Sequence, residues 1–179
     1  GQVCSIVSDR HDEKIEAQVV GFRDNFVLLM ALDSVHLIHP GCKVSSQRNN
    51  NFVPSGPALL GRIIDGMGRP IDGKGPLLAP RREGFYAEPP NPLSRSMISE
   101  PFSTGIKSID TFIPMGVGQR IGIFSGSGVG KSILLGMIAR GSDSDINVIS
   151  LVGERGRELR EFVEKDLGPE GMKKTVIVV

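Results

Sequence analysis

The sequence predicts a small all-β domain followed by part of an α/β domain with a parallel sheet. Short apolar runs separated by Gly, Asp and Asn turns occupy residues 1–75, a pattern typical of a small barrel. Six prolines crowd residues 76–101, which predicts a stiff, extended connector because proline fixes φ and lacks an amide donor. In residues 102–179, apolar runs alternate with segments of helical period, as they do in α/β domains.

The first 75 residues are expected to form short strands. Ile15–Val20 and Phe26–Leu32 are rich in Val, Leu, Ile and Phe, and residues 23–25 form a turn between them. Lys43–Ser46 follows a Pro-Gly break, and Ala58–Ile64 is a further apolar run that ends at a Gly-rich turn. No convincing helical period interrupts this pattern, so we expect a barrel here.

The last 78 residues are expected to alternate helices and strands. Helices are predicted over 104–112 (with Thr104 as a possible cap), 133–140 and 158–167, and strands over 120–124, 147–152 and 175–179. The continuous apolar run at 147–152 predicts a strand buried on both faces of a parallel sheet. The sequence stops at the apolar strand 175–179, and its bare edge would invite aggregation. We therefore expect the chain to be a fragment of a longer protein.

The composition argues against several classes of protein. The chain is 39% hydrophobic and 23% charged, which is typical of a globular protein, and its net charge of +1 provides no field to hold a polyanion. We therefore expect no binding to nucleic acid. Cys4 and Cys42 are too few for a disulfide framework, and His36 and His39 have no further ligands nearby, so we expect reduced thiols and a structural histidine pair. No signal peptide or membrane span is evident, which predicts a soluble intracellular protein.

One motif carries a specific chemistry. The run SGSGVGKS at 125–132 follows a predicted strand and opens a predicted helix, the context of a phosphate-binding P-loop. Its glycines allow the backbone amides to form a nest for phosphate oxygens, and the helix adds the positive end of its dipole. Ser125 replaces the usual first glycine, but this position mainly needs a small side chain. The residues expected to bind Mg²⁺ and ATP are Gly126, Ser127, Gly128, Val129, Gly130, Lys131 and Ser132, with Lys131 reaching the β and γ phosphates and the Ser132 hydroxyl ligating the metal.

A second motif follows the next predicted strand. The run GERGRE at 153–158 would lie at the carboxyl end of a parallel strand, the edge where ligands bind. A carboxylate at Glu154 can orient the water that attacks a γ-phosphate, and Arg155 can meet the developing negative charge. A surface Glu–Arg cluster that caps the following helix explains the same residues almost as well.

Three further stretches carry a resemblance. They are GRIID through GRPIDG at 61–73, TGIKSID at 104–110 and GQR at 118–120. With the two motifs above, they resemble the hexameric ATPases that include rotary ATP synthase subunits and type III export ATPases. In non-catalytic rotary subunits the position of Glu154 is typically glutamine, and Ser132 with Gly156 looks like the export branch. The resemblance is strong from residue 58 onward and implies a partial RecA-like P-loop ATPase core.

The resemblance also implies a function. Lys131 would bind phosphates, Glu154 would activate water and Arg155 would contact the γ-phosphate, so these three are the expected catalytic residues. The complete protein would be an Mg-dependent ATPase that energises protein export for a flagellum or a virulence secretion system. It would form a homo-hexamer with export-apparatus proteins, export substrates and chaperones as partners, in the cytoplasm and peripheral to the inner membrane.

Other functions stay open at this stage. A catalytic subunit of a rotary ATP synthase would share the same motifs, although Ser132 and Gly156 argue against it. A nucleic-acid motor is disfavoured by the near-zero charge and by an aromatic content of only 5%. The chain by itself could be a non-hydrolysing nucleotide-binding or assembly module. We expect these 179 residues alone to hydrolyse ATP negligibly.

Overall fold

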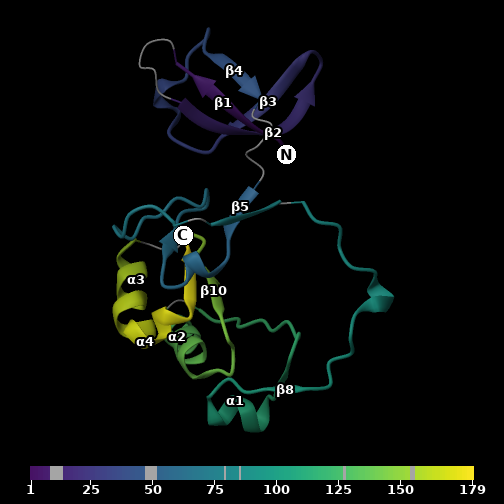
Figure 1. The fold of residues 1–179 in the computed structure, drawn as a ribbon, viewed down its shortest axis with the longest axis vertical. Helices are drawn as coiled ribbons and strands as arrows, with labels where there is room; N and C mark the ends of the chain where they lie inside the picture. Colours follow the sequence, from purple (N-terminus) through teal and green to yellow (C-terminus); the bar gives the residue numbers. More distant parts are fainter. Residues whose placement is uncertain (9–13, 47–51, 79, 85, 127, 154–155) are drawn as a thin grey trace. The chain divides into compact units, whose positions relative to one another are not determined.

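The computed structural model describes residues 1–8, 14–46, 52–78, 80–84, 86–126, 128–153 and 156–179, which divide into two compact units (Figure 1). One unit comprises Gly1–Val53 with Glu83–Ala87, and the other comprises Pro54–Arg82 with Glu88–Val179. The sequence placed residues 54–75 with the N-terminal strands, whereas the structure groups them with the α/β part.

The N-terminal unit is built on an antiparallel four-stranded sheet in the order β3-β2-β1-β4. Its strands are β1 (Val3–Val7), β2 (Lys14–Arg23), β3 (Phe26–Ala31) and β4 (Lys43–Ser46), with a 3₁₀ turn η1 (Val35–Leu37) before β4. The strands predicted at 15–20, 26–32 and 43–46 are therefore confirmed. Closure of this sheet into a barrel stays a prediction.

Alternation of side chains explains the core of this unit. Ile15 and Ala17, two residues apart on β2, lie on one face and pack with Ile6 of β1. The sharp turn between β2 and β3 places Asp24 at φ 51, a left-handed conformation that Asp tolerates better than most residues. A separate two-stranded sheet pairs β5 (Phe52–Ser55) with β7 (Arg81–Gly84).

The second unit contains a parallel sheet in the order β10-β11-β6. Its strands are β10 (Asn147–Ser150), β11 (Thr175–Val178) and β6 (Ile63–Ile64), and an antiparallel pair joins β8 (Pro101–Phe102) to β9 (Met115–Gly116). The helices are α1 (Lys107–Phe112), α2 (Lys131–Gly141), α3 (Gly156–Glu161), the π-helical segment η4 (Phe162–Leu167) and α4 (Gly168–Lys173), with 3₁₀ turns η2 (Pro57–Leu59) and η3 (Pro92–Ser94). The predicted helix at 133–140 is confirmed as part of α2.

The core of the second unit lies between the sheet and these helices. Figure 1 shows α2, α3 and α4 gathered beside β10. The buried side chains come from α2, η4 and the two longer strands, and they are Ala139, Ile149, Phe162, Leu167 and Ile177. Among the described residues, no helix is long and apolar enough to cross a membrane.

Two predicted strands are wrong. The run at 58–64 begins as the 3₁₀ turn η2, because Gly56 at φ 99 and Pro57 redirect the chain, and only its last two residues form β6. The run at 120–124 has no strand structure, since no described strand pairs with it, and Phe124 is 96% exposed. An apolar run alone therefore does not form a strand without a neighbour to complete its ladder.

The remaining predictions for the α/β part need smaller corrections. β10 is buried on one face only, because Val148 is 72% exposed, while Ile149 is buried. β11 is not a bare edge, since it pairs with β10 on one side and β6 on the other. The helix predicted to end at Leu167 does end there, but it begins at Gly156 and its last six residues are π-helical.

Candidate functional site

The glycine-rich loop is shaped by left-handed backbone. Gly128 has φ 76 and Gly130 has φ 95, and Gly130 is the N-cap of α2, with its carbonyl accepting from the amide of Leu134 at 2.9 Å. A Cβ atom placed on Gly126, Gly128 or Gly130 would meet nothing within 4 Å. The loop therefore combines the conformation that only glycine adopts without strain with open space beside its backbone.

Lys131 and Ser132 stand at the start of α2, where the helix dipole is positive. They line a cavity of about 580 Å³ together with the glycines of the loop, Ile133 of α2, and four residues of α3 and η4: Glu158, Glu161, Lys165 and Asp166. Within the described part of the chain, the Lys131 ammonium group makes no hydrogen bond or ion pair. An ammonium group, a helix N-terminus and an open glycine loop together fit an anion such as a phosphate.

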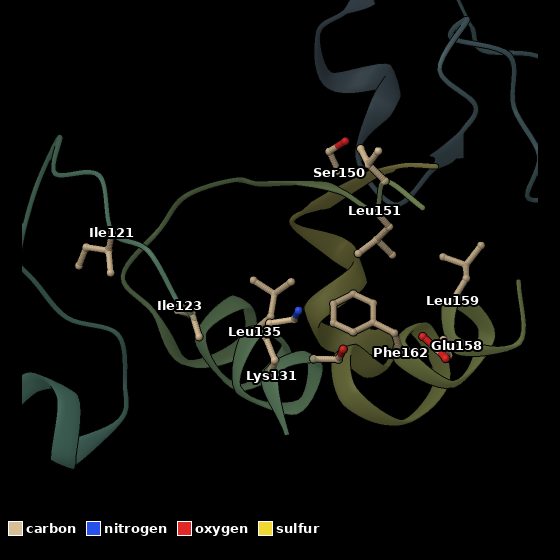
Figure 2. A pocket seen from close by; sticks show the side chains of 11 residues that line it. Ile121, Ile123, Lys131, Leu135, Ser150, Leu151, Glu158, Leu159 and Phe162 are labelled. Atoms are coloured by element: carbon tan, nitrogen blue, oxygen red, sulfur yellow. The ribbon is translucent and has the colours of Figure 1, made fainter. Parts of the chain in front are cut away.

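A second cavity of about 390 Å³ adjoins the same residues (Figure 2). Lys131, Ser132 and Glu158 line both cavities, so they stand where the two meet. Figure 2 shows the Phe162 ring between Leu135 of α2 and Leu159 of α3. The apolar walls of this cavity contrast with the charged lining of the first.

A network of hydrogen bonds fixes the turn at residues 103–110, which contacts the C-terminal end of α2. The Asp110 carboxylate accepts from the amide and hydroxyl of Thr104, at 2.9 and 2.6 Å, and from the Ser103 hydroxyl at 3.0 Å. These hydrogen bonds, the strongest from the Thr104 hydroxyl, lower the pKa of Asp110. Thr104 is fully buried and α1 begins after Ile106, so Thr104 organises the preceding turn and is not the predicted helix cap.

The same turn contacts the C-terminus of α2 very closely. Gly105 has φ 74, and a Cβ atom there would overlap the Gly141 carbonyl group. The amide of Asp143 also donates to the Ser103 carbonyl at 3.1 Å. The TGIKSID motif thus anchors the helix whose other end carries Lys131.

The GRIID–GRPIDG motif is a closed network rather than part of this site. Arg62 Nε donates to Asp72 Oδ2 at 2.7 Å, and the amides of Ile63 and Lys74 donate to the same carboxylate at 3.1 and 3.0 Å. The Arg62 hydrogen bonds hold the pKa of Asp72 far below its usual range. The Asp72 side chain is 4% exposed, so the pair is largely buried.

A second aspartate closes the intervening turn. Burial alone would raise the pKa of Asp65, but the amides of Arg69 and Met67 and the Arg69 guanidinium donate to it and lower the pKa overall. Both aspartates therefore serve the fold of this segment.

The structure brings most of the predicted site residues together. Gly126, Gly128, Gly130, Lys131 and Ser132 line one cavity, and Val129 lies between them, 67% exposed. The predicted Ser127, Glu154 and Arg155 lie outside the described residues. The described residues include no cluster of three or more His, Cys, Asp or Glu side chains suited to a metal.

Sequence reasoning missed Glu158 as a site residue. It ends the GERGRE run and lies in the first turn of α3, from which it reaches both cavities beside Lys131 and Ser132. The signal was present, since a carboxylate shortly after a parallel strand that follows a P-loop belongs at the same edge. Glu154, four residues earlier in the same run, is the first carboxylate after the strand and the one that the motif points to.

Comparison with known proteins finds relatives along the whole chain. Residues 105–179 match the ATP synthase alpha/beta family, nucleotide-binding domain. The chain is 47% identical to a flagellum-specific ATP synthase of Treponema pallidum, covering 99% of this chain and 40% of the relative. It is 40% identical to a type 3 secretion system ATPase of Sinorhizobium fredii, covering 100% and 40%. The chain is a homologue of the type III export ATPases.

Solved structures agree with this assignment. The assembled ATPase EscN of the enteropathogenic E. coli type III secretion system matches with a TM-score of 0.86 and 41% identity, covering 100% of this chain and 42% of EscN. EscN in complex with its central stalk EscO matches with a TM-score of 0.81 and 40% identity, covering 100% and 46%. The chain therefore spans about 40% of the length of these export ATPases.

Proposed function

We propose that the full-length protein is an Mg-dependent ATPase that powers type III protein export. The observation that carries the proposal is the open glycine loop at the start of α2, with Lys131 facing the cavity beside it. The relatives named above support the export role. Identities to the flagellar and virulence relatives overlap, at 42–48% and 40–42%, so the proposal covers both kinds of export system.

The charges of the loop cavity favour a metal-bound nucleotide. Its described lining contains two lysines and three carboxylates, and Lys165 is already paired with Glu161 at 2.6 Å. Because carboxylates outnumber lysines in this lining, a bare triphosphate would add to an excess of negative charge, whereas a divalent cation on the phosphates offsets it. The ligand we propose is therefore Mg-ATP, with the Ser132 hydroxyl as the protein's metal ligand.

Each group of the chain has a distinct task in this proposal. The loop amides and Lys131 hold the phosphates, and bound Mg²⁺ neutralises charge on the phosphate oxygens. Glu154 orients the attacking water and Arg155 meets the charge on the γ-phosphate, roles that rest on the motif resemblance. The same resemblance supports a RecA-like core behind an N-terminal barrel.

We also propose the setting in which this site works. The complete protein forms a homo-hexamer, as the motif resemblance implies, and the similar ATPase EscN is an assembled protein in its solved structures. Its partners are export-apparatus proteins, export substrates and chaperones, and it works in the cytoplasm at the inner membrane.

The test compares variants of the full-length protein by calorimetry and phosphate release. We expect Lys131→Ala to weaken Mg-ATP binding at least 100-fold, because an ammonium beside the β and γ phosphates is lost. Glu154→Gln should bind normally and no longer hydrolyse ATP. The matched control is Lys173→Ala, which removes an exposed lysine paired with Glu170 and should change neither quantity. Equal weak binding by all four proteins would refute the proposal.

A further inference from the structure

The helix that follows the glycine loop carries a glycine in its interior. Gly136 of α2 is buried, and a Cβ atom placed on it would lie 2.8 Å from both the Cβ and the carbonyl oxygen of Asp166 in η4. Real Cβ atoms essentially never approach backbone so closely, and backbone cannot rotate away as a side chain can. Glycine at this position therefore sets the separation of α2 from η4.

The π-helical form of η4 explains why this approach occurs. Phe162 and Leu167 are five residues apart, and both are buried in the same core cluster at 3% and 0% exposure. Five residues make about 1.4 turns of an α-helix, which would direct one of the two side chains away from the core. The wider π turn, with its i→i+5 bonds, brings both onto one face. It also brings the backbone at Asp166 against Gly136.

The position of η4 determines where Glu158 stands. η4 continues α3 without a break, and α3 carries Glu158, which lines both cavities with Lys131 and Ser132. On the α2 side, Gly136 lies five residues after Lys131, on the same helix. Any separation of α2 and η4 therefore changes the distance between the lysine and the glutamate across the site (Figure 2).

We propose that Gly136 is a positioning residue for ATP hydrolysis, and that it acts through Glu158. The inference rests on the proposed function, because it assigns a task to a contact within the same site. The phosphates are held by Lys131 at the start of α2 and by the loop that leads directly into this helix. A Cβ atom added at position 136 would push η4 away from α2, and it would therefore move Glu158 while the phosphate-binding groups stay in place.

The experiment measures kcat, KM and the Kd for Mg-ADP in the full-length protein. We expect Gly136→Ala to lower kcat about tenfold or more, because displacement of a site residue by ~1 Å can cost up to 100-fold. The Kd should change less than threefold. The matched control is Gly141→Ala on the same helix, where an added Cβ meets other atoms only at 3.5 Å or beyond. This control should leave kcat unchanged.

A double-mutant cycle separates positioning from simple packing. If Gly136→Ala acts through Glu158, the variant carrying both Gly136→Ala and Glu158→Gln should lose no more activity than Glu158→Gln alone. Losses in kcat that multiply would overturn the inference, as would a kcat equal to that of the Gly141→Ala control. Loss of the folded state of Gly136→Ala at 25 °C, measured by circular dichroism, would also overturn it. If the unsubstituted protein itself neither binds nor hydrolyses Mg-ATP, the proposed function fails instead.

Discussion

The two glycine-rich motifs of the second unit differ in how their charges are satisfied. In the segment from Gly61 to Gly75, the Asp72 carboxylate accepts hydrogen bonds from the Arg62 guanidinium and from two backbone amides. Lys74 Nζ donates to the Gly61 carbonyl at 2.8 Å. In the loop before α2, the glycines face open space, and Lys131 has no ionic partner among the described residues. A motif that satisfies its own charges stabilises the fold, whereas one that presents a cation to a cavity is available for a ligand.

The largest change in stability is expected for Asp72→Asn. The substitution leaves the Arg62 guanidinium, whose side chain is only 12% exposed, without its carboxylate. Removal of one partner from a fully buried pair costs about 3–5 kcal/mol. We expect roughly 2 kcal/mol of lost unfolding free energy, because asparagine still accepts the two amides and the segment lies near solvent. Urea unfolding of the substituted and unsubstituted proteins measures this loss.

Glu170→Gln provides the control for this comparison. Glu170 forms an ion pair with Lys173, and both side chains are more than two-thirds exposed, so its loss should barely affect stability. Mg-ATP affinity should be unchanged in both variants. If Asp72→Asn lost more binding free energy for Mg-ATP than unfolding free energy, relative to the unsubstituted protein, the structural role assigned to this segment would be wrong.

Lowering the pH should progressively remove the contribution of the Asp72 carboxylate to the free energy of unfolding. The folded-state pKa of Asp72 lies below its unfolded value of about 3.9, so the stabilisation is fully present above that value and declines as the pH falls below it. The difference in unfolding free energy between the unsubstituted protein and Asp72→Asn should therefore be constant from pH 7 to about pH 5 and shrink toward pH 3. Urea titrations at each pH test this. A difference that grew in acid would show that the carboxyl is not held in its charged form.

The sequence predicted the loop better than it predicted the sheet. Residues 126–132 form a local motif, in which glycine conformation and the following helix are determined by neighbours in the chain. Whether 58–64 and 120–124 become strands depends instead on which strands pair with them. Only the last two residues of the first run pair with β11, a strand more than 100 residues away, so propensity alone could not reveal it.

The missed features share a physical cause. The π turn at 162–167 follows from burying Phe162 and Leu167 together, and a helical-period analysis assumes 3.6 residues per turn. Likewise, Thr104 has the sequence features of a helix cap, but its hydroxyl donates to Asp110, six residues later, and accepts from the amide of Ile106, which still lies before the helix. Competition between local and longer-range hydrogen bonds decides such cases, and the sequence alone does not rank the competitors.

Of the substitutions within the two motifs, Gly130→Ala in the loop is expected to have the smaller effect on stability. Gly130 has φ 95, and an L-residue in left-handed backbone costs about 1–2 kcal/mol, partly offset by the lower chain entropy of unfolded alanine. The net loss should be about 1 kcal/mol, yet Mg-ATP binding should weaken strongly, because the backbone amides are redirected. Gly118→Ala is the control, since Gly118 has φ 88, an added Cβ has room there, and the residue lines neither cavity. It should lose a similar amount of stability and keep its affinity for Mg-ATP. If Gly130→Ala instead lost stability and kept its affinity, as Asp72→Asn should, the distinction between the two motifs would be wrong.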